Sequence, residues 1–410
     1  MPAFLPARLF SQVCAIAGVL AIVGLAACEP PPAPKPPPTP PVQQTQPKFG
    51  SRHPLTQEEP GFVRLSNTPR GRVPVRVGVL LPFSNGAAAT RNLAKAMLNA
   101  AQLALFDSRN PDILLLTADE GSTPSEAAAG ARTLLAEGAE VIVGPLFAQG
   151  VNAVAPVARD RAVPVIALSS DRAVAQADVY LLSYQPETEV RRVISYAAAQ
   201  GHKNFTALIP RNAYGDHVLA AFRTEAAADK VTIRAVLRFD PGTTEYTQTA
   251  SAANASGADA VLIAQGGTAL AGLAATLGNP HPQLLGTGLW ANRATTTEPA
   301  LVGGWFAGPP PRATESFESR YRVAFGAPPP ELAALAYDGL SLVAALAGGP
   351  AYHRFTPTAL TDPNGFSGVS GVFRFNPDGS CDRGLAILAV EPDGFRVLDP
   401  APRTFQAPAS

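Results

Sequence analysis

Side chains able to act in catalysis are scattered along this sequence rather than grouped. The five histidines, at positions 53, 202, 217, 281 and 353, show no spacing typical of metal ligands. The sequence has neither a G-x-S-x-G nucleophile elbow nor a P-loop. Asp119 and Glu120 are adjacent, so on a strand their carboxylates would point to opposite faces, and we expect solvent or a ligand loop around them. We therefore predict a protein that is not an enzyme, with no catalytic residues, no metal and no cofactor.

One glycine pattern raises the question of nucleotide binding. Gly286-Thr-Gly-Leu-Trp-Ala291 formally matches G-x-G-x-x-A and follows an expected strand. A dinucleotide site would also need a helix that opens at the glycines and an acidic residue about 20 positions later. Neither is evident, and the pattern comes late in the chain rather than in the first βαβ unit. We interpret the match as chance.

The composition limits the partners. The chain has 410 residues, of which 46% are apolar and 16% are charged, and 32 Lys and Arg balance 32 Asp and Glu. This balance argues against nucleic acid as a partner, because binding phosphates needs a surplus of positive side chains. The apolar fraction excludes wholesale disorder, and the length suggests two domains, or one domain with appendages.

The amino terminus is typical of an export signal. Arg8 precedes an apolar run, Val13–Ala27, whose fifteen residues are fewer than the roughly 20 needed to span a bilayer. We therefore predict a signal peptide over residues 1–27. The string Leu25-Ala-Ala-Cys28 resembles the lipobox of bacterial lipoproteins, which implies cleavage before Cys28 and lipidation of that residue. The alternatives are an ordinary signal peptide with a chance cysteine and a short membrane anchor.

Proline dominates the segment that follows. Ten of the nineteen residues from Glu29 to Pro47 are proline, which fixes φ and removes backbone donors, so this segment cannot join a core. We expect a polyproline II spacer, continued by residues 48–72, so that 28–72 forms a disordered linker behind the acylated cysteine. A ligand for a proline-reading domain is the alternative. Cys14 leaves with the signal peptide, and for the remaining free thiol, Cys381, we expect a structural role.

From Val73 onward, short β-rich runs alternate with helical segments, which predicts an α/β fold with parallel sheets. Strands are expected over Val75–Leu81, Ile113–Thr117, Val141–Val143, Val163–Leu168, Asn204–Ile209, Thr232–Phe239, Ala260–Ile263 and Gln283–Leu285. Helices are expected over Asn92–Leu105, Thr123–Glu137, Ala148–Asp160, Pro186–Gln200, Tyr214–Asp229, Thr314–Phe325 and Leu332–Ala347. Asn-Pro-Asp-Gly and Glu-Pro-Asp-Gly turns predict an antiparallel meander of three strands near the carboxyl end, at Gly371–Phe375, Leu385–Glu391 and Phe395–Leu398.

The alternation restarts near Ser183–Pro186, so we predict two doubly wound lobes within residues 73–400. The last two expected helices have no strand between them, and we assign them to the first lobe, which then covers about 73–184 and 309–350. The second lobe is expected to cover about 185–308 and 366–400.

The order of these elements resembles the type I periplasmic binding proteins, the Leu/Ile/Val-binding family. The matching strings are Val77-Gly-Val-Leu-Leu-Pro82, Gly144-Pro145, Val163–Ser170, Tyr214-Gly215, Leu335-Ala-Tyr-Asp-Gly339 and Gly365–Gly371. Within the family, Ala96–Asp107 resembles the penicillin-binding-protein activator branch of lipoproteins. The resemblance implies two lobes, joined by hinge strands, that close on a ligand at the carboxyl ends of the strands.

The family's ligand site carries over unevenly. The residues predicted to bind a ligand are Ser169 and Ser170 from the matching serine loop, Tyr214 at a pocket aromatic position, and Gln265 as a polar side chain. Asp171 and Arg172 are further candidates, and for each of these residues a loop cap or surface position is the alternative. Leu146–Gln149 stand where amino-acid binders carry Ser and Thr, and Leu289 stands about where an acid would hold the amine. Because a buried ammonium without a partner is costly, an ordinary zwitterionic amino acid is disfavoured as ligand.

Two functions follow as expectations from the resemblance. In the first, a lipid-anchored periplasmic binding protein captures a small polar, amino-acid-like ligand in the cleft and serves an ABC-type permease. In the second, the protein regulates a penicillin-binding protein in peptidoglycan synthesis through surface contacts. Both place the chain in the periplasm, held to a membrane by lipid, and we favour the outer membrane.

Overall fold

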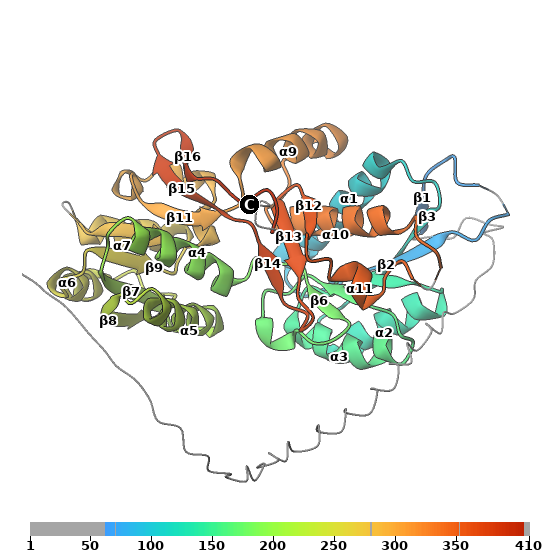
Figure 1. Cartoon of the computed structure of the whole chain (residues 1–410), viewed down its shortest axis with the longest axis horizontal. Helices are drawn as coiled ribbons and strands as arrows, with labels where there is room; N and C mark the ends of the chain where they lie inside the picture. The colour runs from blue at the N-terminus through green and yellow to red at the C-terminus, as the bar shows by residue number, and fades with distance from the viewer. Residues whose placement is uncertain (1–61, 70, 279–280, 352, 406–410) are drawn as a thin grey trace, which may run out of the picture. The chain divides into compact units, whose positions relative to one another are not determined.

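The structure is a computed structural model that describes residues 62–405 except 70, 279–280 and 352. The expected signal peptide 1–27, the lipidation site Cys28 and the linker up to residue 61 lie outside the described residues. Three sheets and the helices packed on them make up the described part of the chain (Figure 1). Within this part, no helix combines the length and apolar character that crossing a membrane requires.

The first sheet has six strands in the order β1-β3-β2-β4-β5-β6, and each neighbouring pair except β1–β3 is parallel. Its strands are β1 (Phe62–Arg64), β2 (Val75–Leu81), β3 (Ile113–Asp119), β4 (Val141–Val143), β5 (Val165–Ala167) and β6 (Val179–Leu181). All seven residues of β2 are buried, as expected for a parallel strand covered by helices on both faces. β1 lies inside the segment expected to be linker, and it forms because it pairs antiparallel with the edge of β3.

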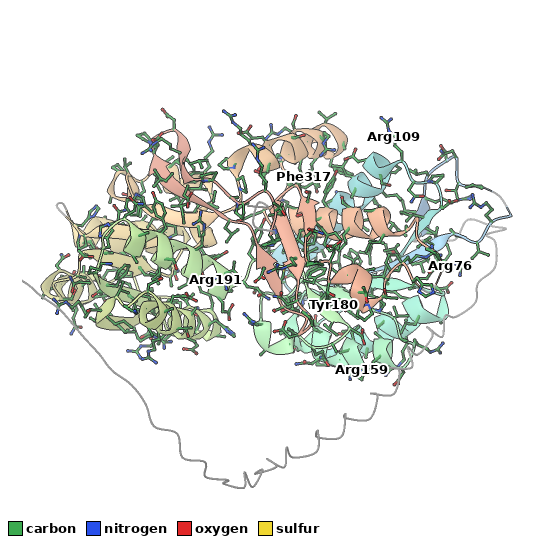
Figure 2. All side chains as sticks on the ribbon, in the orientation of Figure 1. Arg76, Arg109, Arg159, Tyr180, Arg191 and Phe317 are labelled. Carbon is green, nitrogen blue, oxygen red and sulfur yellow. The ribbon has the colours of Figure 1, made fainter. Side chains whose placement is uncertain are left out.

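Helices cover both faces of the first sheet. One face carries α1 (Ala88–Ser108), α9 (Pro311–Phe325) and α10 (Ala333–Leu346), and the other carries α2 (Pro124–Ala136) and α3 (Ala148–Arg159). α1 and α10 lie side by side although they are far apart in the sequence (Figure 1). Phe317 of α9 points into the same core, with its ring centroid 5.1 Å from that of Tyr337 on α10 (Figure 2). These helices complete the first lobe.

The second sheet has seven strands in the order β16-β15-β11-β10-β9-β7-β8. Its strands are β7 (Asn204–Pro210), β8 (Thr232–Phe239), β9 (Ala260–Ile263), β10 (Gln283–Gly286), β11 (Trp305–Gly308), β15 (Ala386–Glu391) and β16 (Gly394–Asp399). α4 (Pro186–Ala199) and α5 (Ala213–Ala228) pack on one face, and α6 (Thr247–Ala255) and α7 (Gly267–Leu277) pack on the other. Shorter elements are η1 (Arg172–Val174), η2 (Gly288–Trp290), α8 (Arg293–Thr296), η3 (Pro299–Leu301) and α11 (Pro357–Leu360).

The carboxyl-terminal strands divide between two sheets instead of forming one meander. β12 (Phe366–Gly368), β13 (Gly371–Phe375) and β14 (Cys381–Arg383) form a third, antiparallel sheet, whereas β15 and β16 join the second. Phe373 and Phe375 lie two residues apart on β13 and pack into the core of the first lobe. The ring of Phe375 is 5.3 Å from that of Tyr180 on β6 (Figure 2). Residues 366–383 therefore pack with the first lobe, whereas the order of elements in the sequence places them in the second.

A buried arginine connects the segments that pass between the lobes. Arg383, which is 5% exposed, donates from Nε to the carbonyl oxygen of Ser183 at 3.1 Å and from Nη1 to Ser370 Oγ at 2.9 Å. Its guanidinium lies over the ring of Tyr184 at 4.6 Å and 4.0 Å from a carboxylate oxygen of Asp338 on α10. Burial raises the pKa of Asp338, and Arg383 opposes that rise. The guanidinium thus holds β14 and the segment before α4 in one position.

Candidate functional site

A cavity of about 610 Å³ lies between residues of the two lobes. The first lobe contributes the segments that follow β4 and β5, and the second contributes the segments that follow β7 and β10. Because parallel strands all end at the same edge of a sheet, the cavity lies at the carboxyl ends of both sheets, where α/β proteins usually bind ligands. Its wall is largely apolar, with Leu93, Leu146, Phe147, Leu168, Leu289 and Leu332 among the lining side chains.

Three of the four residues predicted to bind a ligand line this cavity. Ser169 is buried, and its hydroxyl accepts from the backbone N–H of Asp171 at 3.2 Å. Ser170 is exposed in the wall. Tyr214 places its hydroxyl 2.7 Å from that of Thr287, and burial raises the pKa of its phenol. Gln265 lies two residues after the end of β9 and is half-buried, and it is not among the residues that line the cavity.

The two further candidates have partners of their own. Asp171 lines the cavity, and its carboxylate accepts from the backbone N–H of Ala173 at 2.9 Å, which caps η1. The same carboxylate lies 3.6 Å from Nε2 of His217 on α5, whose Nδ1 is 3.4 Å from Glu187 on α4. Arg172 pairs with Asp378 at 3.6 Å and points to the third sheet rather than to the cavity. His217 therefore connects an acid of the first lobe to an acid of the second.

The backbone N–H groups at the start of α3 donate to a carboxyl group of the chain itself. Glu120 is 2% exposed, and it accepts from the N–H of Leu146 at 2.8 Å and from the N–H of Phe147 at 2.9 Å. Burial raises the pKa of Glu120 to about 7, although the two hydrogen bonds lower it. Amides at a helix start are a favourable position for an anion. At this position the anion is internal, beside the loop whose residues Leu146 and Phe147 line the cavity.

Glu189, like Asp171, is a carboxyl group that lines the cavity. It lies in the first turn of α4, is 5% exposed, and accepts from the backbone N–H of Gly288 at 3.1 Å. A Cβ atom at position 288 would lie 2.5 Å from Glu189 Oε1, so this approach requires glycine. The pKa of Glu189 is raised to about 8, mainly by burial and in smaller part by the nearby Glu331 and Glu187.

Glu331 is a further carboxyl group at the cavity, and it belongs to the first lobe, whereas Glu189 belongs to the second. It precedes α10 and lines the cavity. Its side chain reaches solvent, yet the cleft surrounds it with protein, and this desolvation raises its pKa to about 7. Neither Glu331 nor Glu189 is among the residues predicted from the sequence. Glu189 stands among the acids that ordinarily favour a helix start, and Glu331 stands beside a proline-rich turn, so nothing in the local pattern marks either one.

The glycines of the G-x-G-x-x-A match have a packing explanation. A Cβ at Gly286 would lie 2.2 Å from the ring of Trp290, which is fully buried. Gly288 is needed for the approach of Glu189. The residues after β10 form the short η2 rather than a long helix, so the segment has no helix start suited to a pyrophosphate.

Comparison with known families identifies the fold. A family model described as periplasmic binding protein matches residues 74–394, and the chain belongs to that family. This confirms the resemblance to type I periplasmic binding proteins and the α/β fold with two doubly wound lobes. A search of curated proteins finds no match to the sequence.

Solved structures share the fold at low sequence identity. A putative branched-chain amino acid ABC transporter protein from Rhodospirillum rubrum is 18% identical, with a TM-score of 0.72 over 80% of this chain and 100% of that chain. A solute-binding protein of an ABC transporter from R. palustris, in complex with benzoate, is 18% identical, with a TM-score of 0.60 over 80% of this chain and 97% of that chain. A branched-chain amino acid transporter substrate-binding protein from Streptococcus pneumoniae, in complex with isoleucine, is 20% identical, with a TM-score of 0.59 over 80% of this chain and 100% of that chain.

Proposed function

We propose that this protein is a non-enzymatic, periplasmic solute-binding protein that captures a small organic ligand between its lobes and delivers it to an ABC-type permease. The observation that carries the proposal is the cavity of about 610 Å³, which both lobes line at the carboxyl ends of their strands. Pockets for small organic molecules typically measure about 300–1,000 Å³ and combine an apolar wall with a few polar groups. Membership of the periplasmic binding protein family supports this role and the periplasmic location.

The names of the similar structures support a small organic solute. They include proteins of amino acid ABC transporters and complexes with isoleucine and with benzoate. Apolar side chains such as Leu93, Leu168 and Leu332 would suit the body of such a solute, while Ser169 and Ser170 would offer hydroxyl groups. The serines and Tyr214 remain our proposed ligand-binding residues, and Gln265 would contribute only if it moved toward the cavity.

The alternative function, regulation of a penicillin-binding protein, has less support. Its sequence basis is Ala96–Asp107, which lies on α1. In this string Met97 is fully buried in the core of the first lobe, and the Asp107 carboxylate is bound by Arg320 and by the hydroxyl of Tyr337. These contacts give the string a packing role between α1, α9 and α10. We therefore retain solute binding as the proposal.

Thermal denaturation of the purified full-length protein tests this proposal. A panel of amino acids, aromatic carboxylates, amines and sugars should contain a ligand that raises the melting temperature, because a ligand present at 100 times its Kd stabilises the folded state by about 2.7 kcal/mol. Ser170→Trp should fill the cavity and remove the shift. Ser316→Trp, on the exposed side of α9, is the matched control and should keep it. A shift that persists in Ser170→Trp would place the ligand elsewhere and contradict the proposal.

A further inference from the structure

We propose that the cavity selects an organic cation with an apolar body, such as a protonated amine, whose charge lies between Glu189 and Glu331. The ligand would carry no free carboxylate at the start of α3. This inference rests on the proposed function, because it names the chemical class of the solute that the same cavity would bind. Three features support it: the charge of the wall, the occupied anion position, and the placement of the two acids.

The charge of the cavity wall is one-sided. Three of the lining residues are acids, namely Asp171, Glu189 and Glu331. Among the described residues that line the cavity, none is Lys, Arg or His. An anionic ligand would find no positive side chain in this wall and would be repelled by each acid that is ionised, which disfavours its binding. A cation would be attracted by every ionised group of the wall.

The position that would best hold a ligand carboxylate is already filled. The N–H groups of Leu146 and Phe147 donate to Glu120 at 2.8 and 2.9 Å, and both residues line the cavity. A ligand carboxylate would have to displace the buried Glu120 and would leave that carboxyl group without its two donors. Loss of hydrogen bonds to a buried polar group is costly. This explains why a zwitterionic amino acid fits poorly even though the family's fold is complete.

Glu189 and Glu331 approach the cavity from different lobes. Glu189 belongs to α4 of the second lobe, and Glu331 precedes α10 of the first. Both carboxyl groups line the same cavity, and the charge of Glu331 adds to the raised pKa of Glu189. A cation between them would convert this repulsion into two attractions and draw the two lobes onto the ligand.

None of the other charged groups near Glu189 pairs with its carboxyl group as a cation would. Glu187 adds negative charge, and Arg383 adds positive charge that opposes it. Arg383, however, is bound to Ser370 and the carbonyl oxygen of Ser183 and lies beside Asp338, so it is not free to turn toward the cavity. His217 lies between Asp171 and Glu187 rather than at Glu189. The fixed hydrogen bond of Glu189 comes from a neutral amide, that of Gly288.

The rest of the wall suits the body of an organic cation rather than a bare metal ion. Leu93, Leu168, Leu289 and Leu332 supply apolar surface, and Phe147 and Tyr214 supply aromatic rings. Rings beside an ammonium group stabilise it through the quadrupole of the π-system, most strongly where water is excluded. An amine with a branched aliphatic or a benzyl body combines both requirements.

Matched probes separate the charge of a ligand from its shape. Isoamylamine, leucine and 4-methylvalerate share one aliphatic body and differ in charge, and benzylamine and benzoate form a second pair. Titration calorimetry with the full-length protein near neutral pH should give the amines a Kd at least about tenfold lower than the matched carboxylates, with leucine as weak as the carboxylate. Glu189→Gln and Glu331→Gln should each weaken amine binding about tenfold or more. Glu318→Gln, an exposed acid of α9, is the control and should change nothing.

The outcomes distinguish this inference from the proposed function. Glutamine at position 189 keeps an acceptor for the N–H of Gly288, and the melting temperature of each variant shows that it folds. Binding of 4-methylvalerate, benzoate or leucine as tightly as the amines overturns the inference but leaves solute binding standing. Amine binding that is unchanged in both glutamine variants also overturns it. If none of the five probes binds, the inference is wrong, whereas a shift with a sugar in the thermal panel would still support solute binding.

Discussion

Three glutamates near one cavity differ in what holds them. Glu120 accepts from two backbone amides, Glu189 accepts from one, and Glu331 reaches the solvent of the cleft. In all three the largest influence on the pKa is desolvation, which raises it to about 7, about 8 and about 7 respectively. Glu189 and Glu331 line the cavity, and a pair of acids with raised pKa values in one cleft is typical of a functional site.

These raised pKa values predict that the unliganded protein loses stability as the pH rises. A carboxyl group whose pKa is higher in the folded chain than in the unfolded one binds an extra proton when folded, so its contribution is present at low pH and is lost as the pH rises through the folded value. For Glu189 the pKa rises from 4.5 to about 8. The melting temperature should therefore fall as the pH rises from about 5 to about 8, and that of Glu189→Gln should fall less.

The size of this effect has an upper bound. One pKa unit corresponds to about 1.4 kcal/mol, so Glu189→Gln should gain at most a few kcal/mol of unfolding free energy at the upper end of the range. Chemical denaturation at both pH values measures it, with Glu318→Gln as control. Equal pH dependence in wild type and Glu189→Gln would show that Glu189 ionises normally in the folded protein.

Glu120 gives a second prediction at the scale of one residue. Glu120→Ala removes the internal acceptor and leaves the N–H groups of Leu146 and Phe147 buried without partners, which should cost about 1–3 kcal/mol of stability. Small carboxylates should bind in the space left behind. Acetate should therefore restore part of the melting temperature of Glu120→Ala, while chloride at the same concentration and acetate with wild type should not. If acetate does not raise the melting temperature of Glu120→Ala, the two amides do not form an anion site.

The residues of the cavity were predictable from the sequence only in part. Ser169, Ser170 and Tyr214 were predictable as cavity residues because each follows the end of a parallel strand, and chain order alone determines that. Glu189 and Glu331 were not predictable as cavity residues, because they come together only when elements of the two lobes, α4 and the segment before α10, lie at the same cavity. Leu289, which stands where amino-acid binders were expected to carry an acid, does line the cavity, and the carboxyl group beside its neighbour Gly288 is that of Glu189, on a separate helix.

At the scale of elements, strands delimited by an apolar run or by turns were predictable, and strands defined by their pairing were not. β2, β4, β8 and β9 have the predicted bounds, because a continuous apolar run or its flanking turns delimit each one. β6, β11 and β14 have only three or four residues, and their pairing with neighbouring strands rather than their composition makes them strands. β1 is a further example, since only its pairing with β3 distinguishes it from the linker sequence around it.

The turn between β13 and β14 yields a prediction about packing. Gly379 has φ +84°, and a Cβ there would lie 2.2 Å from the carbonyl oxygen of Val179, which precedes Tyr180 on β6. Its own carbonyl accepts from the N–H of Leu181 at 2.8 Å, so the turn continues the edge of the first sheet. Gly379→Ala should destabilise the protein by about 2 kcal/mol or more, measured by chemical denaturation.

Another glycine provides the control for that turn. Gly394, in the second hairpin, has no positive φ, and a Cβ added to it would meet no atom within 4 Å, so Gly394→Ala should have little effect. If both substitutions cost the same, the contact between the Asn-Pro-Asp-Gly turn and β6 would not contribute to stability.

At the scale of the whole molecule, the sequence predicted the two-lobed fold but not how the lobes are connected. Alternating strands and helices define the lobes, and the order of elements was enough to indicate the family. The Arg383 contacts with Ser183, Ser370 and Asp338 join segments that are distant in the chain, Arg383 and Ser183 being 200 positions apart, and no local pattern indicates them.

The proposed attachment to a membrane also belongs to this scale, and it lies outside the described residues. We propose that Cys28 is acylated and that the proline-rich linker holds the lobes away from the membrane in the periplasm. Cells that express Cys28→Ala should incorporate no labelled fatty acid into the protein, whereas Cys381→Ala should be labelled normally. Continued labelling of Cys28→Ala would contradict the lipoprotein assignment.

The central claim is that one small solute occupies the cavity between the lobes. Native mass spectrometry tests it most directly, because it counts the molecules bound to each chain when the full-length protein is mixed with the ligand panel. Our account predicts a single bound molecule per wild-type chain and none on Ser170→Trp, in which the cavity is filled. Equal occupancy of the two proteins, or no occupancy of wild type by any member of the panel, would contradict it.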